Sequence, residues 1–465
     1  MARLLLSLPV EILHMIASEL PNSAIKKLRR TCSFASMVFR LRLNRVFLSP
    51  HQRDIDVFCE VARSETLRHQ VVELVWDQNR FCLGYMGREA LFGPLQVEHD
   101  FATEVVRFQR NRIANTGCLT SDDPTTFGES NTPLSPIAKT NVEILLRREA
   151  NEYSNNDTFA LEYNINRFPS LRRITISHST NGWLFEPFYE TPMIRSFPPN
   201  FMYDVDRYDY PIEPLQQRDL GGRTNWSQYS KSTRGYRAIF RALAAAKELQ
   251  LEEVVIDTPS GVECGLPFDF FALGITSDYL NFVELLRRPH LRRFDLAITA
   301  SGDIPVYDNQ AHPPIDLLRD ALREATSLTH FSFKFDTSAP VTNWVPLKAL
   351  LPVDRWTNLQ HFELFYFTVK QNDVANLLGE LPDSVRSIEL GFLDFCAESE
   401  SHAGLLDEIL GRAFWNERDE MNRPRLCISL SVSPQASRSM VIGWTPKLRI
   451  SYISKERTHS VVQGA

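Results

Sequence analysis

The chain has 465 residues, a net charge of −6 and a hydrophobic content of 43%. This length exceeds that of one small module and suits one large domain or two modest ones. The mildly acidic charge gives no general attraction to nucleic acid or to a membrane surface, so neither is expected as a partner. No apolar stretch approaches the roughly 20 residues that cross a bilayer.

The first fifty residues predict three short amphipathic helices. Pro9 suits the first helical position, Glu11 lies near the positive end of the helix dipole, and Pro21 ends the helix. Asn22 and Ser23 are candidate caps of the second helix. Apolar residues at helical spacing form the inner stripes of the three helices: Leu8, Ile12, Leu13, Ile16, Ala17 and Leu20 in the first, Ile25 and Leu28 in the second, and Cys32, Ala35, Val38, Phe39 and Leu43 in the third.

A module of this size has too small a core to be stable by itself. It either caps the rest of the chain or binds another protein, and periodicity alone leaves both interpretations open. Its sequence resembles an F-box, and the resemblance rests on LPVEIL at residues 8–13, Leu20, Leu28, Cys32 and LNRVFLS at residues 43–49. Phe34, Met37 and Phe39 stand in the region where many F-boxes have a tryptophan.

The resemblance implies binding to the Skp adaptor of Skp–cullin–F-box ubiquitin ligases and, through the adaptor, to a cullin. The residues that it assigns to the adaptor contact are Leu8, Pro9, Glu11, Ile12, Ile16, Leu20, Leu28 and Cys32. The seven cysteines form no Cys-x-x-Cys pair. Their odd number favours free thiols in an intracellular protein, of the cytoplasm or the nucleus, over a disulfide framework or a zinc site.

Short apolar strands recur after the module, each with an anchor residue and further apolar residues three and five positions on. The last two lie on the same side of a strand, because side chains alternate. The sets are Val71/Leu74/Trp76, Leu171/Ile174/Ile176, Leu251/Val254/Ile256, Leu291/Phe294/Leu296, Leu328/Phe331/Phe333, Leu359/Phe362/Leu364 and Val385/Ile388/Leu390, with Leu426/Ile428/Leu430 as a looser eighth. Helical patterns lie between several strands, at residues 236–249, 279–288, 315–325, 374–381 and 404–415.

Strands that alternate with helices predict a parallel sheet, either in a leucine-rich-repeat horseshoe or in a doubly wound α/β domain. The repeated triplet favours the horseshoe. Successive anchors from Leu251 onward are 40, 37, 31 and 26 residues apart; the last spacing falls within the repeat period of roughly 20–29 residues, and the others exceed it. The asparagine or cysteine usual in this repeat is missing, so the repeats are degenerate. An F-box followed by such repeats resembles a class of fungal F-box proteins.

We therefore predict an α/β fold in which a three-helix F-box (1–50) precedes an irregular leucine-rich-repeat-like solenoid (51–433) and a C-terminal segment (434–465). Two stretches interrupt the repeats. Residues 111–141 predict a polar loop. The aromatic and proline-rich insertion 178–235 either folds back over the repeat core, which we favour, or binds a partner through its aromatic side chains.

We find no phosphate-binding glycine loop, no G-x-S-x-G motif and no metal-binding histidine pair, so no catalytic residue, metal or cofactor is expected. The concave face of a horseshoe would instead present the side chains that alternate with the buried ones. These are Glu73, Arg173, Thr175, Glu253, Asp257, Arg293, Asp295, His330, Ser332, Lys334, His361, Glu363 and Glu389. Their mixed, mildly acidic character suits an unknown protein target.

The leading hypothesis is a non-catalytic substrate-recognition adaptor, which holds a target near a ubiquitin-loaded enzyme and acts through proximity. The alternative is a Skp-bound structural or trafficking factor that acts outside ubiquitination. A third interpretation is an α/β enzyme with an accidental F-box-like start. It predicts a pocket of polar groups at the carboxyl ends of the strands.

Overall fold

The computed structural model of the chain describes residues 8–20, 22–78, 143–144, 147–148, 150–178, 180, 188–197, 226–258, 265–300, 313–337, 346–397, 399–412, 423–431, 447–452 and 461–463. Within these ranges the chain is an α/β protein with a mostly parallel sheet, as predicted. The predicted polar loop 111–141 lies outside the described residues.

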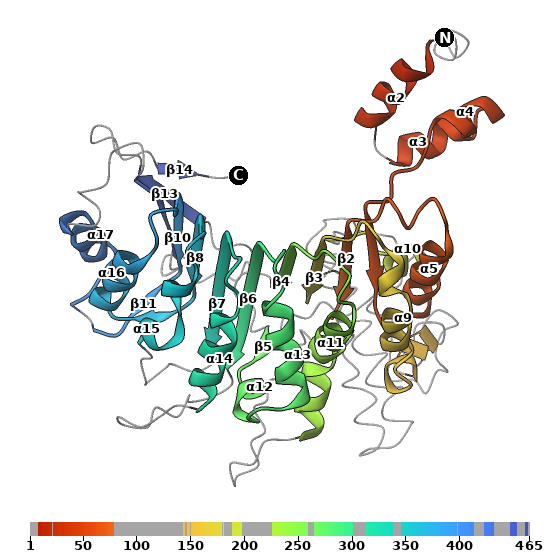
Figure 1. Cartoon of the computed structure of the whole chain (residues 1–465). Coiled ribbons are helices and arrows are strands. Elements are labelled where there is room, and N and C mark those ends of the chain that lie inside the picture. The colour runs from red at the N-terminus through yellow and green to blue at the C-terminus, as the bar shows by residue number, and fades with distance from the viewer. Residues whose placement is uncertain are drawn as a thin grey trace, which may run out of the picture.

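Nine strands run parallel and follow the order of the chain across the sheet (Figure 1). They are β1 (Arg45–Leu48), β2 (Glu73–Asp77), β3 (Arg173–Ser177), β4 (Glu253–Asp257), β6 (Arg293–Ala300), β7 (His330–Thr337), β8 (His361–Phe365), β10 (Ser387–Gly391) and β12 (Arg425–Ser431). β13 (Lys447–Tyr452) and β14 (Val461–Gln463) add an antiparallel edge. The shorter strands are β5 (Leu266–Pro267), which pairs with β6, and β9 (Thr368–Val369) with β11 (Asp394–Phe395), which form a small sheet of their own.

The helices line one side of this sheet in the same order (Figure 1). They are α5 (Gln52–Arg63), α9 (Asn156–Asn164), α11 (Trp226–Ala245), α12 (Asp269–Ala272), α13 (Ser277–Leu286), α14 (Pro313–Arg323), α15 (Leu347–Leu350), α16 (Gln371–Glu380) and α17 (His402–Gly411), with the short α10 (Pro192–Ser196) beside α5. The main core lies between the helices and the sheet. It contains the anchor and both strand members of all seven complete triplets.

The five helices predicted between strands are confirmed, four of them within a few residues. α11 differs, because it begins at Trp226, ten residues before the predicted start. The end of the predicted insertion 178–235 is therefore helical. The first ten residues of this helix are mostly polar, and Trp226 and Tyr229 alone do not make an apolar stripe, so periodicity does not reveal them.

Three helices form a separate N-terminal module, α2 (Val10–Glu19), α3 (Asn22–Arg29) and α4 (Ser33–Val38). They lie beyond one end of β1 and β2, away from the row of sheet-covering helices (Figure 1). The module has its own small core, made of Leu13, Ala17, Ile25, Ala35, Val38 and Phe39.

Three details of the module differ from the prediction. Leu43 packs against the main core, because the third helix ends at Val38. Asn22 lies inside the second helix and bonds to the backbone of Arg42 instead of capping the helix. The sheet begins at Arg45, within the range 1–50 assigned to the module, because Val46 and Leu48 alternate with half-exposed neighbours and pair with β2.

Candidate protein-binding surfaces

The N-terminal module exposes an unusual share of apolar side chains. Among the described residues, six of the thirteen exposed large apolar side chains lie in it: Leu8, Val10, Ile12, Met15, Phe34 and Met37. Apolar side chains exposed together on a protein surface are a feature of interaction sites. The module therefore exposes apolar side chains in addition to having its own core.

The residues predicted to meet an adaptor divide into two groups. Leu8, Pro9, Glu11 and Ile12 are exposed around the start of α2. The remaining four, Ile16, Leu20, Leu28 and Cys32, are half-buried. Leu20, Leu28 and Cys32 pack against the small core, and the Cys32 Sγ caps α4 by accepting from the N–H of Ala35. Sequence reasoning did not include Met15, Phe34 and Met37, which are also exposed.

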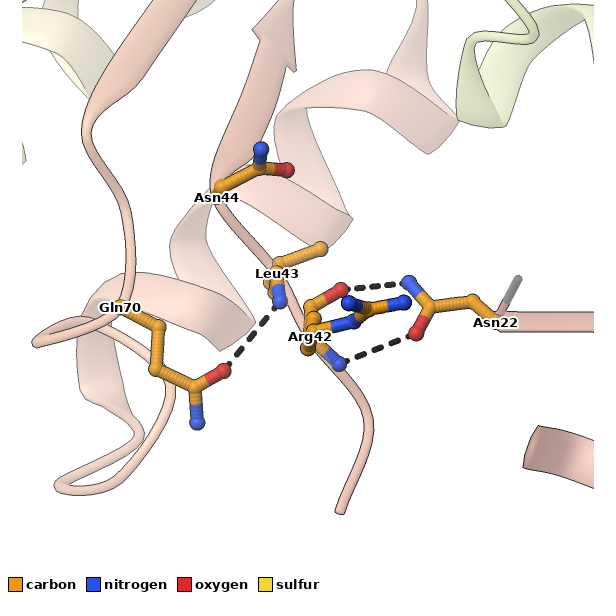
Figure 2. Close-up of a pocket in the computed structure, with 5 residues that line it drawn as sticks. All are labelled: Asn22, Arg42, Leu43, Asn44 and Gln70. Carbon is orange, nitrogen blue, oxygen red and sulfur yellow. Dashed lines mark hydrogen bonds between the residues drawn. The ribbon is translucent and has the colours of Figure 1, made fainter. Parts of the chain in front are cut away.

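A joint connects the module to the sheet (Figure 2). The side-chain amide of Asn22 pairs with both backbone groups of Arg42, and Oε1 of Gln70 accepts from the N–H of Leu43 at 3.2 Å. The guanidinium of Arg42 donates to the carbonyls of Ser18 and Leu20, where the helix dipole of α2 favours a cation. Asn22, Arg42, Leu43, Asn44 and Gln70 line a polar pocket of about 420 Å³ at this joint.

The side of the sheet opposite the helices is the second candidate surface, called here the open face. The parallel register aligns the first residues of successive strands in one row across it. The row runs Arg45, Glu73, Arg173, Glu253, Arg293, His330 and His361. Charges therefore alternate over the first five strands, and opposite charges on neighbouring strands attract.

Ion pairs and hydrogen bonds link the charged side chains at the start of β1 to β4. The carboxylate of Glu73 accepts from Arg45 Nε at 2.6 Å and from the Thr175 hydroxyl at 2.7 Å. Arg173 Nε lies 3.4 Å from Glu73 Oε1, and Arg173 Nη1 donates to Glu253 Oε2 at 3.2 Å. Glu73 is 7% exposed, so its charge is held by these donors and not by water.

The β6–β10 half of the open face has a different balance of positive and negative charges. The register places Asp295, Glu363 and Glu389 in one row. Arg293 Nη2 donates to Asp295 Oδ2 at 2.6 Å. Burial raises the pKa of Glu363, with Asp295 and Glu389 adding to the increase. Burial, helped by Arg293, lowers the pKa of His330 to about 4, so this imidazole is neutral at pH 7.

Ten of the thirteen side chains predicted for the concave face lie on strands β3 to β10, alternate with the buried rows and are at least partly exposed: Arg173, Glu253, Asp257, Arg293, Asp295, His330, Lys334, His361, Glu363 and Glu389. The other three, Glu73, Thr175 and Ser332, are buried. The structure thus brings the ten to one face. That this face binds a target stays a prediction. The described residues contain no cluster of histidine, cysteine and carboxylate side chains that could hold a metal ion.

Polar groups gather at the carboxyl ends of β2 to β4, where the enzyme interpretation predicts a pocket. These groups bond to one another: the Ser177 hydroxyl donates to Asp257 Oδ2 at 3.2 Å, and the Tyr236 hydroxyl lies 2.9 Å from His178 Nε2. The hydroxyl of Tyr189 also donates to Asp257 Oδ2, at 3.3 Å. The arrangement shows a packed polar network, and catalysis stays untested.

Tyr189 belongs to a described part of the predicted insertion, residues 188–197, called here the strap. α10 of the strap packs against α5, and Met193 is fully buried. This part therefore packs on the main domain. Sequence reasoning missed Arg45 and Tyr189 as residues of the open face. The alternation in residues 45–48 is the pattern that could have revealed Arg45.

Neither a protein-family model nor a curated protein matches the chain. No helix in the described ranges is long and apolar enough to cross a membrane. The four described cysteines, Cys32, Cys59, Cys396 and Cys427, are free thiols.

Proposed function

We propose that the chain is a substrate-recognition subunit of a Skp–cullin–F-box ubiquitin ligase, with the N-terminal module as its F-box. The observation that carries the proposal is the module itself. It has a separate core, and it exposes Leu8 just before α2 and Ile12 and Met15 on α2, where the LPVEIL motif lies. A module that served only as a cap would bury these side chains against the main domain.

We propose further that the rest of the chain is a degenerate leucine-rich-repeat solenoid. The last two complete repeats, which start at Leu359 and Val385, have an apolar residue at every leucine position of L-x-x-L-x-L-x-x-N-x-L and differ from it at the asparagine. Phe367 and Leu393 stand there and are buried. The first repeat has Asn79 at this place, outside the described residues, so the asparagine is not missing from every repeat.

In this proposal the open face holds the target, and the mechanism is positioning. The joint at Arg42 fixes the module to the sheet, so a target on the sheet would be presented in a defined place relative to the adaptor. The gain in rate comes from proximity to the ubiquitin-loaded enzyme, and no side chain of this chain takes part in the chemistry.

Co-purification of the full chain with a Skp adaptor tests the proposal. We expect Leu8→Ala with Pro9→Ala to abolish co-purification, since buried anchors of an interface cost about 2 kcal/mol or more when truncated. His14→Ala is the matched control, because His14 is also exposed on α2 but lies off its apolar stripe. Adaptor binding that survives the double substitution would show that the assigned surface is wrong.

The alternative, a Skp-bound structural or trafficking factor, predicts the same co-purification. Cullin-dependent polyubiquitin conjugates on a partner that binds the open face separate the two functions. Their absence, with adaptor binding intact, would favour the structural role.

A further inference from the structure

Tyr189 lies on the β1–β4 half of the open face and makes three different contacts there. Its ring centroid is 5.9 Å from that of Phe47, edge to face, and 5.2 Å from the guanidinium carbon of Arg45. Its hydroxyl donates to Asp257 Oδ2, although Asp257 is three strands away from β1. An aromatic ring, a cation and a carboxylate are thus arranged around one phenol, which is a specific environment for tyrosine.

The two ends of the strap are held differently. At the α10 end, Met193 is fully buried and its N–H donates to Asp54 Oδ1 at 2.7 Å. At the other end Tyr189 is half-buried and Phe188 is 51% exposed. The Tyr189 N–H donates to the Thr180 carbonyl at 3.1 Å, beyond the end of β3. With the strands themselves this end makes contact through the Tyr189 side chain, while the α10 end is embedded in the core.

We propose that Arg45, Phe47 and Asp257 form a binding site for a tyrosine side chain of a peptide, and that Tyr189 occupies this site in cis. The strap is then an internal ligand of the open face. A target with an exposed tyrosine competes with Tyr189 for the same three contacts. This inference rests on the proposed function only in assuming that targets reach the open face.

The charges around the phenol set the specificity of the site. Burial raises the pKa of Tyr189 to about 12; Asp257 and Glu73 add to the increase because they disfavour an anion at the hydroxyl, and Arg45 opposes it. A phosphate on the hydroxyl would place two negative charges beside the Asp257 carboxylate. The site therefore accepts tyrosine and rejects phosphotyrosine.

The test replaces residues 188–197 in the full chain with a Gly/Ser linker of equal length. The probe is a labelled synthetic peptide, FYETPMIRSF, followed by fluorescence anisotropy. We expect the peptide to bind this variant and not the wild-type chain, whose site is occupied. Within the peptide, Tyr189→Ala should weaken binding about tenfold or more, and Tyr189→Phe about threefold through the lost hydrogen bond.

Two further peptides complete the test. Phe188→Ala is the matched control and should leave affinity unchanged, because Phe188 is exposed. Phosphorylation of the tyrosine should weaken binding about tenfold through repulsion by Asp257. Equal affinity of the tyrosine and alanine peptides, tighter binding of the phosphopeptide, or no binding to a folded variant would each overturn the proposal.

A second form covers the case in which the linker variant does not fold. This second variant keeps the strap and carries a protease site within residues 181–187 and another within residues 198–225. The chain is folded first, and both sites are then cut. Excess free peptide should then displace the cut strap, and the Tyr189→Ala peptide should do so less well. Neither experiment uses the Skp adaptor, so failure here leaves the proposed function standing, and loss of adaptor binding leaves this site standing.

Discussion

Asp54 is a fully buried carboxylate that joins three segments of the chain. It lies in the first turn of α5, its Oδ2 accepts from the Ser49 hydroxyl at 2.6 Å, and its Oδ1 accepts from the N–H of Met193 in the strap. Burial raises the pKa of Asp54 to about 7; Asp77 adds to the increase, and the two hydrogen bonds and Arg148 oppose it.

This pKa predicts a pH dependence of stability. Between about pH 4 and pH 7 the folded state holds a proton that the unfolded state has lost, so this group's contribution to stability falls as pH rises through that window. Asp54→Asn keeps the shape and can satisfy both partners without a charge. We expect the free energy of unfolding of the wild type to fall relative to that of Asp54→Asn by up to about 1.4 kcal/mol per pH unit.

Urea denaturation of both proteins from pH 5 to pH 8 checks this expectation. The measurement compares the unfolding free energies of wild type and Asp54→Asn, because His51 changes stability with pH in the opposite direction and does so equally in both proteins. Burial lowers the pKa of His51 to about 4, so its own contribution to stability is lost as pH falls below about 6.5. A difference between wild type and Asp54→Asn that does not change with pH would contradict the assignment.

At the scale of elements, the strands are predictable because apolar residues recur at every second position and are buried between the sheet and the helices. Burial of the other side varies, since β2 is buried along its whole length whereas β8 alternates. On β7, for example, Phe331 and Phe333 are both fully buried, whereas His330 and Lys334 are half-exposed on the open face. α9 is not predictable in the same way. It exposes Phe159, so its apolar residues lie on both sides and form no single stripe.

Prediction from the sequence has the same limit for the surfaces of the molecule. The alternation along each strand predicts which side chains reach the open face, but not which of them are neutralised. The pairing of Glu73 with Arg173 spans a hundred residues and depends on the register of β2 with β3. The contact of Tyr189 with Arg45 depends on a strap that no periodicity describes.

Gly235 allows α11 to pass close to the end of β2. A Cβ atom at this position would lie 1.7 Å from Gln78 Oε1 and 2.5 Å from Trp76 Nε1, two atoms that are themselves joined by a buried hydrogen bond of 3.0 Å. We expect Gly235→Ala to lower the free energy of unfolding by about 1–3 kcal/mol, because these side chains must move inside a packed core.

Chemical denaturation of Gly235→Ala measures this cost. Gly411→Ala is the matched control, since a Cβ there meets nothing within 4 Å and alanine favours the helical end of α17. Equal stability of the two variants would mean that α11 does not approach β2 as closely as described.

At the scale of the whole molecule, the chain has two cores that meet at a narrow joint. The small core of the module shares no residue with the main core. The main core begins with β1, whose Val46 and Leu48 are buried beside β2. The boundary between the two units therefore falls before Arg45, and the joint residues Arg42 and Leu43 mark it.

This boundary predicts how truncated chains behave. A chain that starts at Leu41 loses the module and keeps β1, so the unfolding free energy of the sheet domain should stay within about 0.5 kcal/mol. A chain that starts at His51 also loses Val46 and Leu48 from the core, at about 1.5–3 kcal/mol each. It exposes the edge of β2 as well, which favours pairing between chains and aggregation.

Size-exclusion chromatography and urea denaturation of the two truncated chains distinguish these outcomes. The Leu41 chain should elute as a single species and fail to co-purify with a Skp adaptor, while partners of the open face remain bound. The His51 chain should aggregate or unfold at lower urea. If the Leu41 chain were the unstable one, the module would be a cap that the sheet needs, and its exposed apolar side chains would require a different explanation from docking.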